Sequence, residues 1–327
     1  METFKKSKLK YFLICLLFCL IAISLILIGF SITTNGSLIF LNSINSENRI
    51  DYLSIGLGII GCIIVAISLN FAGEASQSLT RNILASPFTL GLTPIMTLSY
   101  LISSLTNNFP IWAIGLLSLC IMFIFNILPT FYISISKFKH NQNIVILYGL
   151  SLSILISSLI TLLSFFSKDQ SFNVLGWMII EVITFSESKF IYGSLFFVIG
   201  AIIFLLNIKK IHIIEHAYFK ASTLNINFAL LNMISLLAIS LMCIGGFIAY
   251  APFTLLGFAI PYITKKHIIN NYDVRWSLLP STLLSLIVTL LAFIVNCYLQ
   301  TYIDVVTIII MLPFVICMFI SKRNYYE

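Results

Sequence analysis

The feature that most constrains this chain is a succession of long apolar runs, each close to the length of a bilayer-spanning helix. A spanning helix needs roughly 20 mostly apolar residues. The longer runs cover residues 11–34, 52–73, 111–136, 143–166, 190–207, 227–250, 277–299 and 303–321, and two shorter or proline-interrupted runs cover 92–106 and 252–264. The pattern predicts an all-α polytopic membrane protein with about ten transmembrane helices.

Composition favours one membrane domain without an appended catalytic module. Of the 327 residues, 60% are hydrophobic and only 9% are charged, and the mean hydropathy is +1.08. A water-soluble core could not bury so much apolar surface. No soluble-looking block longer than a loop separates the runs, so residues 1–327 are expected to form a single transmembrane domain. The first run has no small-residue cleavage site after it and is interpreted as a retained helix.

The cations fix the expected orientation, because lysine and arginine near span ends favour the cytoplasm. With ten spans and a cytoplasmic N-terminus, the inner segments hold Lys5, Lys6, Lys8, Lys10, Arg81, Lys137, Lys139, Lys209, Lys210, Lys220, Lys265, Lys266, Arg275, Lys322 and Arg323. The outer segments hold only Arg49, Lys168 and Lys189. This asymmetry predicts that both termini are cytoplasmic, and losing or adding one early span would destroy it.

The spans carry no visible energy source of their own. Nearly all acidic residues fall in loops or at span ends, including Glu74, which directly follows the run 52–73. Ionisable groups at the bilayer midplane usually mark coupled transport, and none is convincingly central in this chain. No nucleotide-binding loop, nucleophile elbow or HExxH helix is present in the sequence. We therefore expect a transport pathway that is not an enzyme and is driven by a partner.

Other residue types indicate neither a metal site nor a cofactor. The seven cysteines all lie inside apolar runs without a CxxC or Cys/His cluster, and the four histidines are scattered over three loops. The formal charge of +7 is spread over loop ends, where cations act as topology signals and as contacts to anionic lipid headgroups. We expect no metal, no cofactor and no nucleic-acid partner, and a lipid bilayer as the surroundings.

One polar stretch, QSLTRNILASPFTLG at residues 77–91, stands between two runs apolar enough for lipid. Its residues resemble a motif of the FecCD/BtuC-type permeases, the membrane subunits of ABC importers for iron-siderophores, haem and vitamin B12. Seven residues match the spacing of the family motif: Gly73, Gln77, Asn82, Leu84, Ala85, Pro87 and Gly91. Ile83 stands in place of the usual first proline.

Further stretches are similar to the same family. Gly149 occupies the glycine position of its fifth span, and Glu215 matches the glutamate of its cytoplasmic GExxAxxLG stretch. In LLGFAIPYITKK, Gly257, Pro261 and Lys265 are in register with the family motif F-x-G-L-x-x-P-H-x-x-R, while Tyr262 replaces the histidine.

The resemblance implies a BtuC-like permease fold in a bacterial cytoplasmic (inner) membrane. It implies a separate ABC ATPase, a substrate-binding protein outside, and a second permease copy or a paralogue that completes the pathway. The segment of about 207–227 is expected to form short helices along the inner membrane face as the coupling region. The implied cytoplasmic gate and pathway residues are Gln77, Asn82, Pro87 and Gly91. The implied ATPase-coupling residues are Glu215, Lys220, Ser222, Gly257, Pro261 and Lys265, and the charges expected to dock the binding protein are Glu47, Arg49 and Glu187.

Two other readings stay open at this point. A stand-alone, gradient-driven secondary transporter or flippase also fits ten apolar spans, although it lacks the expected midplane carboxylates. An integral membrane enzyme would need polar residues clustered at one membrane depth, which the sequence does not display. The sequence does not distinguish a ferric siderophore from haem or cobalamin as cargo, since a separate protein would bind it.

Overall fold

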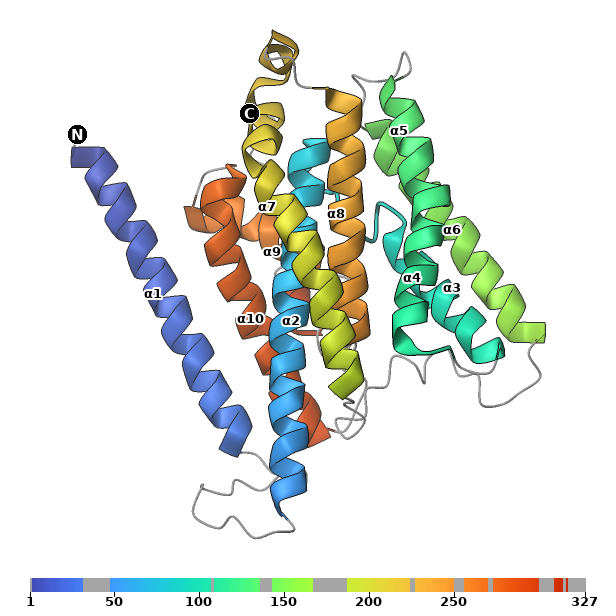
Figure 1. Ribbon diagram of the computed structural model, residues 1–327. Coiled ribbons are helices and arrows are strands. Elements are labelled where there is room, and N and C mark those ends of the chain that lie inside the picture. The colour runs from blue at the N-terminus through green and yellow to red at the C-terminus, as the bar shows by residue number, and fades with distance from the viewer. Residues whose placement is uncertain are drawn as a thin grey trace.

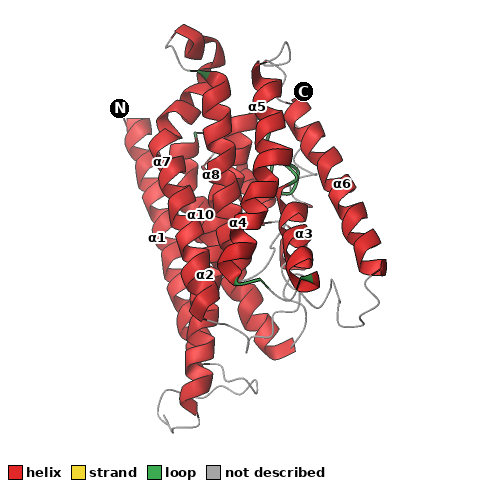
Figure 2. Ribbon diagram, turned by 45° about the vertical axis from the view of Figure 1, so that its right-hand side comes forward, coloured by secondary structure: helices red, strands yellow, loops and turns green. Residues whose placement is uncertain are grey.

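The computed structural model describes residues 2–31, 48–106, 109–135, 143–166, 187–223, 227–249, 256–269, 273–299, 309–313 and 316. Every regular element within these ranges is a helix (Figure 2). The elements are α1 (Glu2–Ser31), α2 (Asn48–Thr80), α3 (Leu92–Leu105), α4 (Ile111–Met122), the π-helix η1 (Phe123–Ile127), α5 (Leu128–Ile135), α6 (Asn143–Phe166), α7 (Glu187–Thr223), α8 (Phe228–Ala249), α9 (Leu256–Ile263), the π-helix η2 (Thr264–Ile269) and α10 (Val274–Leu299). The all-α prediction is confirmed.

Seven stretches of the described chain are long and apolar enough to cross a membrane. They are 11–28 of α1, 56–80 of α2, 111–135 of α4, η1 and α5 together, 143–163 of α6, 188–213 of α7, 228–249 of α8 and 274–295 of α10. The two shorter predicted runs correspond to the short helices α3 and α9. Most of the tenth run, 303–321, lies outside the described residues.

Helix α2 is the axis of the bundle (Figure 1). It packs against α7, α8, α9 and α10, whereas α1 lies along α10 at one edge and α3 to α6 form a group on the other side of α8. Burial follows this arrangement, since 67% of the α2 span is buried but only 11% of the α1 span. Phe12, Leu20 and Leu27 of α1 are exposed, as expected for helices whose outer faces contact lipid acyl chains.

Two helices extend beyond their apolar runs, and both extensions change the sequence interpretation. The run 52–73 predicts a helix that ends before Glu74, but α2 continues to Thr80 and places Glu74 inside the helix. The segment of about 207–227 does not form short helices along the membrane as predicted, because α7 continues through it to Thr223 as one helix of 37 residues. An amphipathic or polar extension costs little once a helix has been nucleated, since each further residue adds a backbone hydrogen bond.

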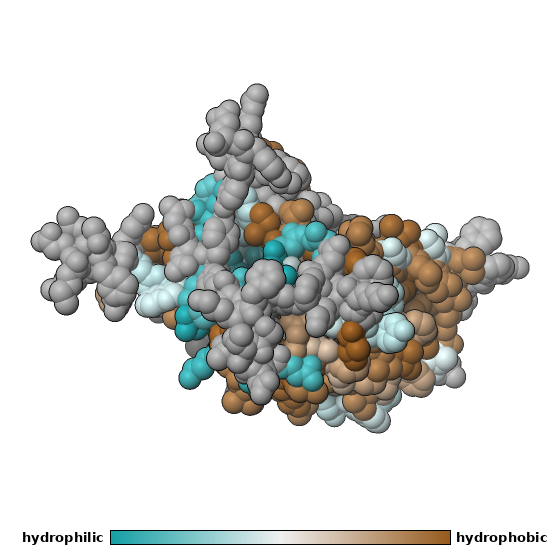
Figure 3. Space-filling view, turned by 90° about the horizontal axis from the view of Figure 1, so that it is seen from above, coloured by the Kyte–Doolittle hydropathy of each residue, from teal (hydrophilic) through white to brown (hydrophobic). Residues whose placement is uncertain are grey.

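The end of the bundle where α2 and α7 finish is the end that the charge distribution assigns to the cytoplasm. Figure 3 looks down on this end and shows hydrophilic atoms gathered near the middle, with a hydrophobic flank on the side of α3 to α6. The site described below is built around the segment after α2 and the π-helix η2.

Candidate functional site

The polar stretch that follows α2 forms an ordered loop of residues 81–91. Arg81 and Gly91 bound it, and both have positive φ, 49° and 80°, which reverses the chain after α2 and again before α3. The backbone N–H of Asn82 donates to the carbonyl of Gln77 at 3.2 Å, and the Asn82 side chain accepts a hydrogen bond from the N–H of Leu84 at 2.9 Å. Asparagine stabilises such turns because its short amide pairs with nearby backbone.

Serine and threonine close the second half of the loop. The Ser86 N–H donates to the Thr89 hydroxyl at 2.8 Å, and the Thr89 N–H donates to the Ser86 hydroxyl at 3.1 Å. Ser86 is buried, as are Ala85, Pro87 and Leu90. Non-helical backbone within a membrane protein must find its hydrogen bonds inside the protein. The small polar residues of this stretch supply such partners for the backbone of the loop.

The loop packs against α6 and η1 through uncharged groups. A Cβ on Gly149 of α6 would lie only 2.5 Å from the Thr89 carbonyl oxygen, so glycine permits the close backbone approach. The Ser153 hydroxyl donates to the Phe88 carbonyl at 3.1 Å, and the buried Asn126 amide donates to the Leu90 carbonyl. The Asn126 contact comes from the π-helix η1, in line with the frequent placement of π-bulges at functional sites.

Helix α9 packs on α2 at a pair of glycines. A Cβ on Gly73 would lie 2.0 Å from the Gly257 carbonyl oxygen, and a Cβ on Gly257 would lie 3.2 Å from Cδ of Pro87. Four residues after Gly73, the Gln77 amide donates to the Phe258 carbonyl at 3.0 Å. The end of α2, the loop and α9 therefore form one closely packed unit.

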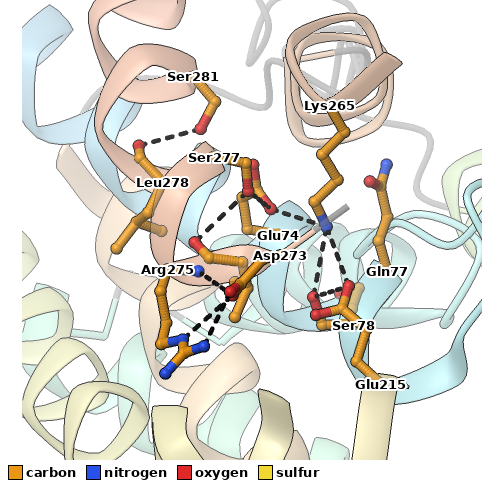
Figure 4. Close-up of polar contacts among 12 residues, drawn as sticks. Glu74, Gln77, Ser78, Glu215, Lys265, Asp273, Arg275, Ser277, Leu278 and Ser281 are labelled. Carbon is orange, nitrogen blue, oxygen red and sulfur yellow. Dashed lines mark hydrogen bonds and ion pairs between the residues drawn. The ribbon is translucent and has the colours of Figure 1, made fainter. Parts of the chain in front are cut away.

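A charged cluster occupies the interior beside this unit (Figure 4). Lys265 of η2 is 2% exposed, and its ammonium lies 2.9 Å from Glu74 Oε2 of α2 and 3.6 Å from Glu215 Oε1 of α7. The Ser78 hydroxyl donates to Glu215 at 3.0 Å, and the Ser277 hydroxyl of α10 donates to Glu74 at 2.9 Å. One ammonium thus contacts two carboxylates that belong to different helices.

Burial makes every contact of this cluster important for stability. The Glu74 side chain is 0% exposed, and that of Glu215 is 10% exposed. Desolvation of buried ions offsets much of their attraction, but removing one partner of a buried pair typically costs about 3–5 kcal/mol because a charge is left uncompensated. Lys265 is the cation that compensates both carboxylates, so the positions of α2 and α7 at this depth depend on it.

A second polar cluster lies at the start of α10. The Asp273 carboxylate accepts hydrogen bonds from the Arg275 backbone N–H at 3.0 Å and from the Arg275 guanidinium at 2.9 Å. His212 of α7 places Nδ1 3.0 Å from Asp273 Oδ1. Burial alone would raise the pKa of Asp273, but the hydrogen bonds from Arg275 and the nearby His212 outweigh burial and hold that pKa below its ordinary value.

The structure brings together most of the predicted inner residues. Gln77, Pro87 and Gly257 meet where α2, the loop and α9 join, and Pro261 lies inside α9. Asn82 contacts Asn143 at the start of α6, at 3.2 Å. Lys265 and Glu215 meet in the charged cluster. Lys220 and Ser222 belong to the last part of α7, where side chains are outside the described set.

The predicted outer residues are only partly placed. Glu47 lies outside the described residues, while Arg49 and Glu187 stand at the starts of α2 and α7, both at the lower end of Figure 1. This end is opposite to the charged cluster. Their proposed contact with a binding protein stays a prediction, as do the gate and coupling roles of the inner residues.

The sequence interpretation missed Glu74, Ser78 and Ser277 as site residues. A usable signal was present, because Asn70, Glu74 and Ser78 recur every four residues and therefore share one face of α2. The matching face of α10 carries Ser277, Ser281 and Ser285, and the Asn70 amide donates to the Ser281 hydroxyl at 2.9 Å. Periodic polar residues within an apolar helix indicate a buried polar face rather than a span end.

The described part of the chain contains no group of three or more histidine, cysteine or acidic residues that could hold a metal ion. The described cysteines, which are Cys15, Cys19, Cys62, Cys120 and Cys243, form no disulfide with one another. What the site offers chemically is a set of hydrogen bonds and one shared ion pair that join helices at the inner end of the bundle. That arrangement suits movement of helices and transport.

The polytopic fold, with broken helices and a buried polar loop at its inner end, defines the class as a membrane transport permease. The chain belongs to the FecCD transport family, whose model matches residues 12–321. The family assignment made from the motif around Gln77 is therefore confirmed, and the match covers the chain from α1 to beyond α10.

One curated relative is also named as a permease of an ABC transporter. Over 208 residues the chain is 24% identical to an uncharacterized ABC transporter permease protein, YvrB, of Bacillus subtilis (strain 168); the match covers 62% of this chain and 58% of YvrB, so it spans little more than half of that relative.

Two solved structures share the fold. An inward-facing metal-chelate type ABC transporter matches with a TM-score of 0.77 and 17% identity, over 95% of this chain and 99% of the other. PsaBC from Streptococcus pneumoniae in complex with Fab matches with a TM-score of 0.53 and 13% identity, over 84% and 93%.

Proposed function

We propose that this chain is the membrane-spanning subunit of an ATP-binding-cassette importer that moves an iron-siderophore complex, or a related chelate such as haem or cobalamin. A separate ATPase supplies the energy, and an extracytoplasmic binding protein delivers the cargo. The observation that carries the proposal is membership of the FecCD transport family over residues 12–321. The likeness of the fold to a metal-chelate type ABC transporter supports the cargo class.

The inner end of the bundle supports a gate formed by Gln77, Asn82, Pro87 and Gly91. These residues belong to the end of α2 and to the loop 81–91, which joins α2 to α3 and is held by α6 and α9. Because α2 is the central helix, a shift of its end displaces the loop. Rigid-body movement of packed helices is a common route by which a transporter opens one side.

The coupling surface for the ATPase is assigned to the end of α7 and to α9 with η2. Glu215, Lys220, Ser222, Gly257, Pro261 and Lys265 belong to these elements. Lys265 is 2% exposed, so it acts within the bundle and does not touch the ATPase itself. The end of α7 supplies the contact with the ATPase. Docking of the binding protein is assigned to Glu47, Arg49 and Glu187, of which Arg49 and Glu187 belong to helices that start at the opposite end.

The pathway itself lies between two permease chains in this proposal. A second copy or a paralogue, related by a twofold or pseudo-twofold axis, gives a closed assembly. The cations of the inner segments fit a bacterial cytoplasmic membrane, with both termini in the cytoplasm.

Reconstitution tests the function directly. The chain is co-expressed with a candidate ABC ATPase and a candidate binding protein of the same organism, and the purified complex is placed in liposomes that contain ATP. We expect the ATPase to co-purify, and we expect uptake of a radiolabelled ferric siderophore, haem or cobalamin to require both ATP and the binding protein.

A gradient-driven transporter would behave differently. Uptake that follows an imposed proton or sodium gradient without ATP, in liposomes that hold this chain alone, contradicts the proposal. The variant Lys220→Glu tests the contact between α7 and the ATPase, because it reverses one charge near the end of α7. It is expected to lose the ATPase during purification, whereas unchanged ATPase retention and uptake would remove that residue from the surface.

A further inference from the structure

Lys265 is placed between two structural units of the inner end. On one side, Glu74 and Ser78 of α2 belong to the unit that α2 forms with α9 and the loop 81–91. On the other side, Glu215 belongs to the part of α7 that extends beyond its apolar run. Figure 4 shows the lysine reaching down from η2, with Glu74 to one side of its ammonium and Ser78 and Glu215 below it.

The two ion pairs of Lys265 are unequal. Its ammonium lies 2.9 Å from Glu74 but 3.6 Å from Glu215, and the Glu74 side chain is 0% exposed while that of Glu215 is 10% exposed. Glu74 also accepts a hydrogen bond from Ser277 of α10, and its neighbour Gly73 is in close backbone contact with α9. The pair with Glu74 is therefore the fixed one, and Glu215 is the contact that can separate.

The charges of this contact allow Glu215 to separate without leaving Lys265 unpaired. When Glu215 is separated from the cluster, Lys265 and Glu74 form a neutral pair. When Glu215 is in place, a second carboxylate shares the ammonium and accepts a hydrogen bond from Ser78 at 3.0 Å. Without the lysine, the two carboxylates would repel each other across a buried site. The ammonium is thus what makes the joined arrangement of α2 and α7 possible.

We propose that Lys265 is a positioning residue for coupling, which joins the cytoplasmic end of α7 to α2 through the shared contact with Glu215 and Glu74. Movement of the α7 end by the ATPase makes or breaks the Glu215 contact, and the fixed side passes the displacement to α2 and to the loop 81–91. This inference rests on the proposed function, because it needs an ATPase that moves α7.

The test compares Glu215→Gln with two lysine variants in the reconstituted complex. Glu215→Gln weakens the separable contact while Glu74 and Lys265 keep their pair. Lys265→Arg keeps the cation. The matched control is Lys266→Met, which removes the neighbouring cation, whose ammonium lies 2.9 Å from the Tyr262 hydroxyl. The readout is the number of ATP molecules hydrolysed for each substrate molecule transported, with ATPase retention and thermal stability measured alongside.

We expect Glu215→Gln to raise the ATP-to-substrate ratio by at least about 5-fold, the lower end of typical coupling effects between sites. The ratio is measured on complexes that retain the ATPase. Lys266→Met is expected to keep the wild-type ratio, and Lys265→Arg, which keeps the cation, is expected to raise the ratio less than Glu215→Gln. A purely structural role would lower stability without changing the ratio, and that outcome overturns the inference. If the wild-type complex itself transports nothing with ATP, the proposed function fails instead, so the two failures are distinguishable.

Discussion

On its two sides, the C-terminal end of α2 and the loop that follows it make different kinds of contact. Toward α7, η2 and α10, the contacts are a shared ammonium, two carboxylates and hydroxyls that donate to them. Toward α6 and η1, the loop 81–91 is held by neutral hydrogen bonds and by close backbone contact at Gly149. Both junctions are largely buried, and both start from the same short stretch of sequence.

This difference indicates which junction can change state. A backbone carbonyl held against a glycine has little freedom, because packed interiors do not deform continuously. An ion pair at 3.6 Å at the margin of the interior can separate when one helix moves, provided that the remaining charges still balance. We therefore expect the neutral junction to act as a fixed support, and the charged junction to be the place where movement enters.

The largest effect is expected from Gly73→Val, which tests the packing of α9 on α2 beside the two junctions. A Cβ at Gly73 would lie 2.0 Å from the Gly257 carbonyl oxygen, so α9 would have to leave α2. We expect no folded protein in detergent, as judged by size-exclusion chromatography. The control is Gly58→Ala in the same helix, whose Cβ would meet the ring of Phe293 at 2.8 Å. A ring can shift, so this variant is expected to fold. A folded Gly73→Val protein would contradict the close α2–α9 contact.

The charged junction is broken most directly by Lys265→Met. This variant leaves two buried carboxylates without their cation, so we expect a loss of about 3–5 kcal/mol in stability, measured by thermal or denaturant unfolding in detergent. Adding Glu74→Met to Lys265→Met removes the fixed carboxylate as well and is expected to recover much of the loss, since apolar replacement of a whole buried pair is often tolerated. Equal stability of wild type and Lys265→Met would show that the pair does not form.

The sequence predicted the helices well because lipid imposes a simple rule on them. Each apolar run of about 20 residues must be a helix, since its backbone groups have no other partners in the bilayer. The polar stretch 77–91 interrupts the apolar runs in the sequence, and its residues 81–91 form the non-helical backbone between α2 and α3. The single run 111–136 proved to contain a π-helix at Asn126, a local change of register that hydropathy does not report.

The charged cluster could not be predicted in the same way. Glu74, Glu215 and Lys265 are far apart in the sequence, and each one alone resembles a solvated charge at a span end. Only the fold brings them together, and only their mutual contact makes burial tolerable. The four-residue spacing of Asn70, Glu74 and Ser78 was the available signal for a buried face. Which residues of α7, η2 and α10 contact this face could be identified only from the structure.

The loop's own backbone is tested by Gly91→Ala. Gly91 has φ of 80°, a left-handed conformation that costs other residues about 1–2 kcal/mol, and its added Cβ would lie 2.9 Å from the Gly149 carbonyl oxygen. We expect a stability loss of about that size or somewhat more. Gly91→Asn separates the two causes, because asparagine tolerates this conformation but still carries a Cβ. If Asn and Ala cost the same, the contact with Gly149 dominates and the backbone conformation does not.

The smallest expected effect belongs to the cluster at Asp273, and it depends on pH. The Asp273 side chain accepts hydrogen bonds at the start of α10, and asparagine keeps that acceptor. Asp273→Asn therefore removes only the charge that pairs with the exposed Arg275, and it is expected to cost about 0.2–1 kcal/mol at pH 7. Because the folded-state pKa lies below the ordinary value, this contribution is complete above the unfolded pKa of about 3.9 and is lost as the pH falls through the lower folded value.

The measurement compares the unfolding of two proteins, the His212→Gln variant and the same variant with Asp273→Asn added. Replacing His212 in both proteins removes the neighbouring histidine from the comparison. The stability difference between the two proteins is expected to stay constant from pH 8 to pH 5 and to shrink toward pH 3. The other carboxylates are common to both proteins, so the Asp273 carboxyl is the titrating group by which they differ. A difference that already disappears near pH 6 would mean that Arg275 does not hold the carboxylate as the structure describes.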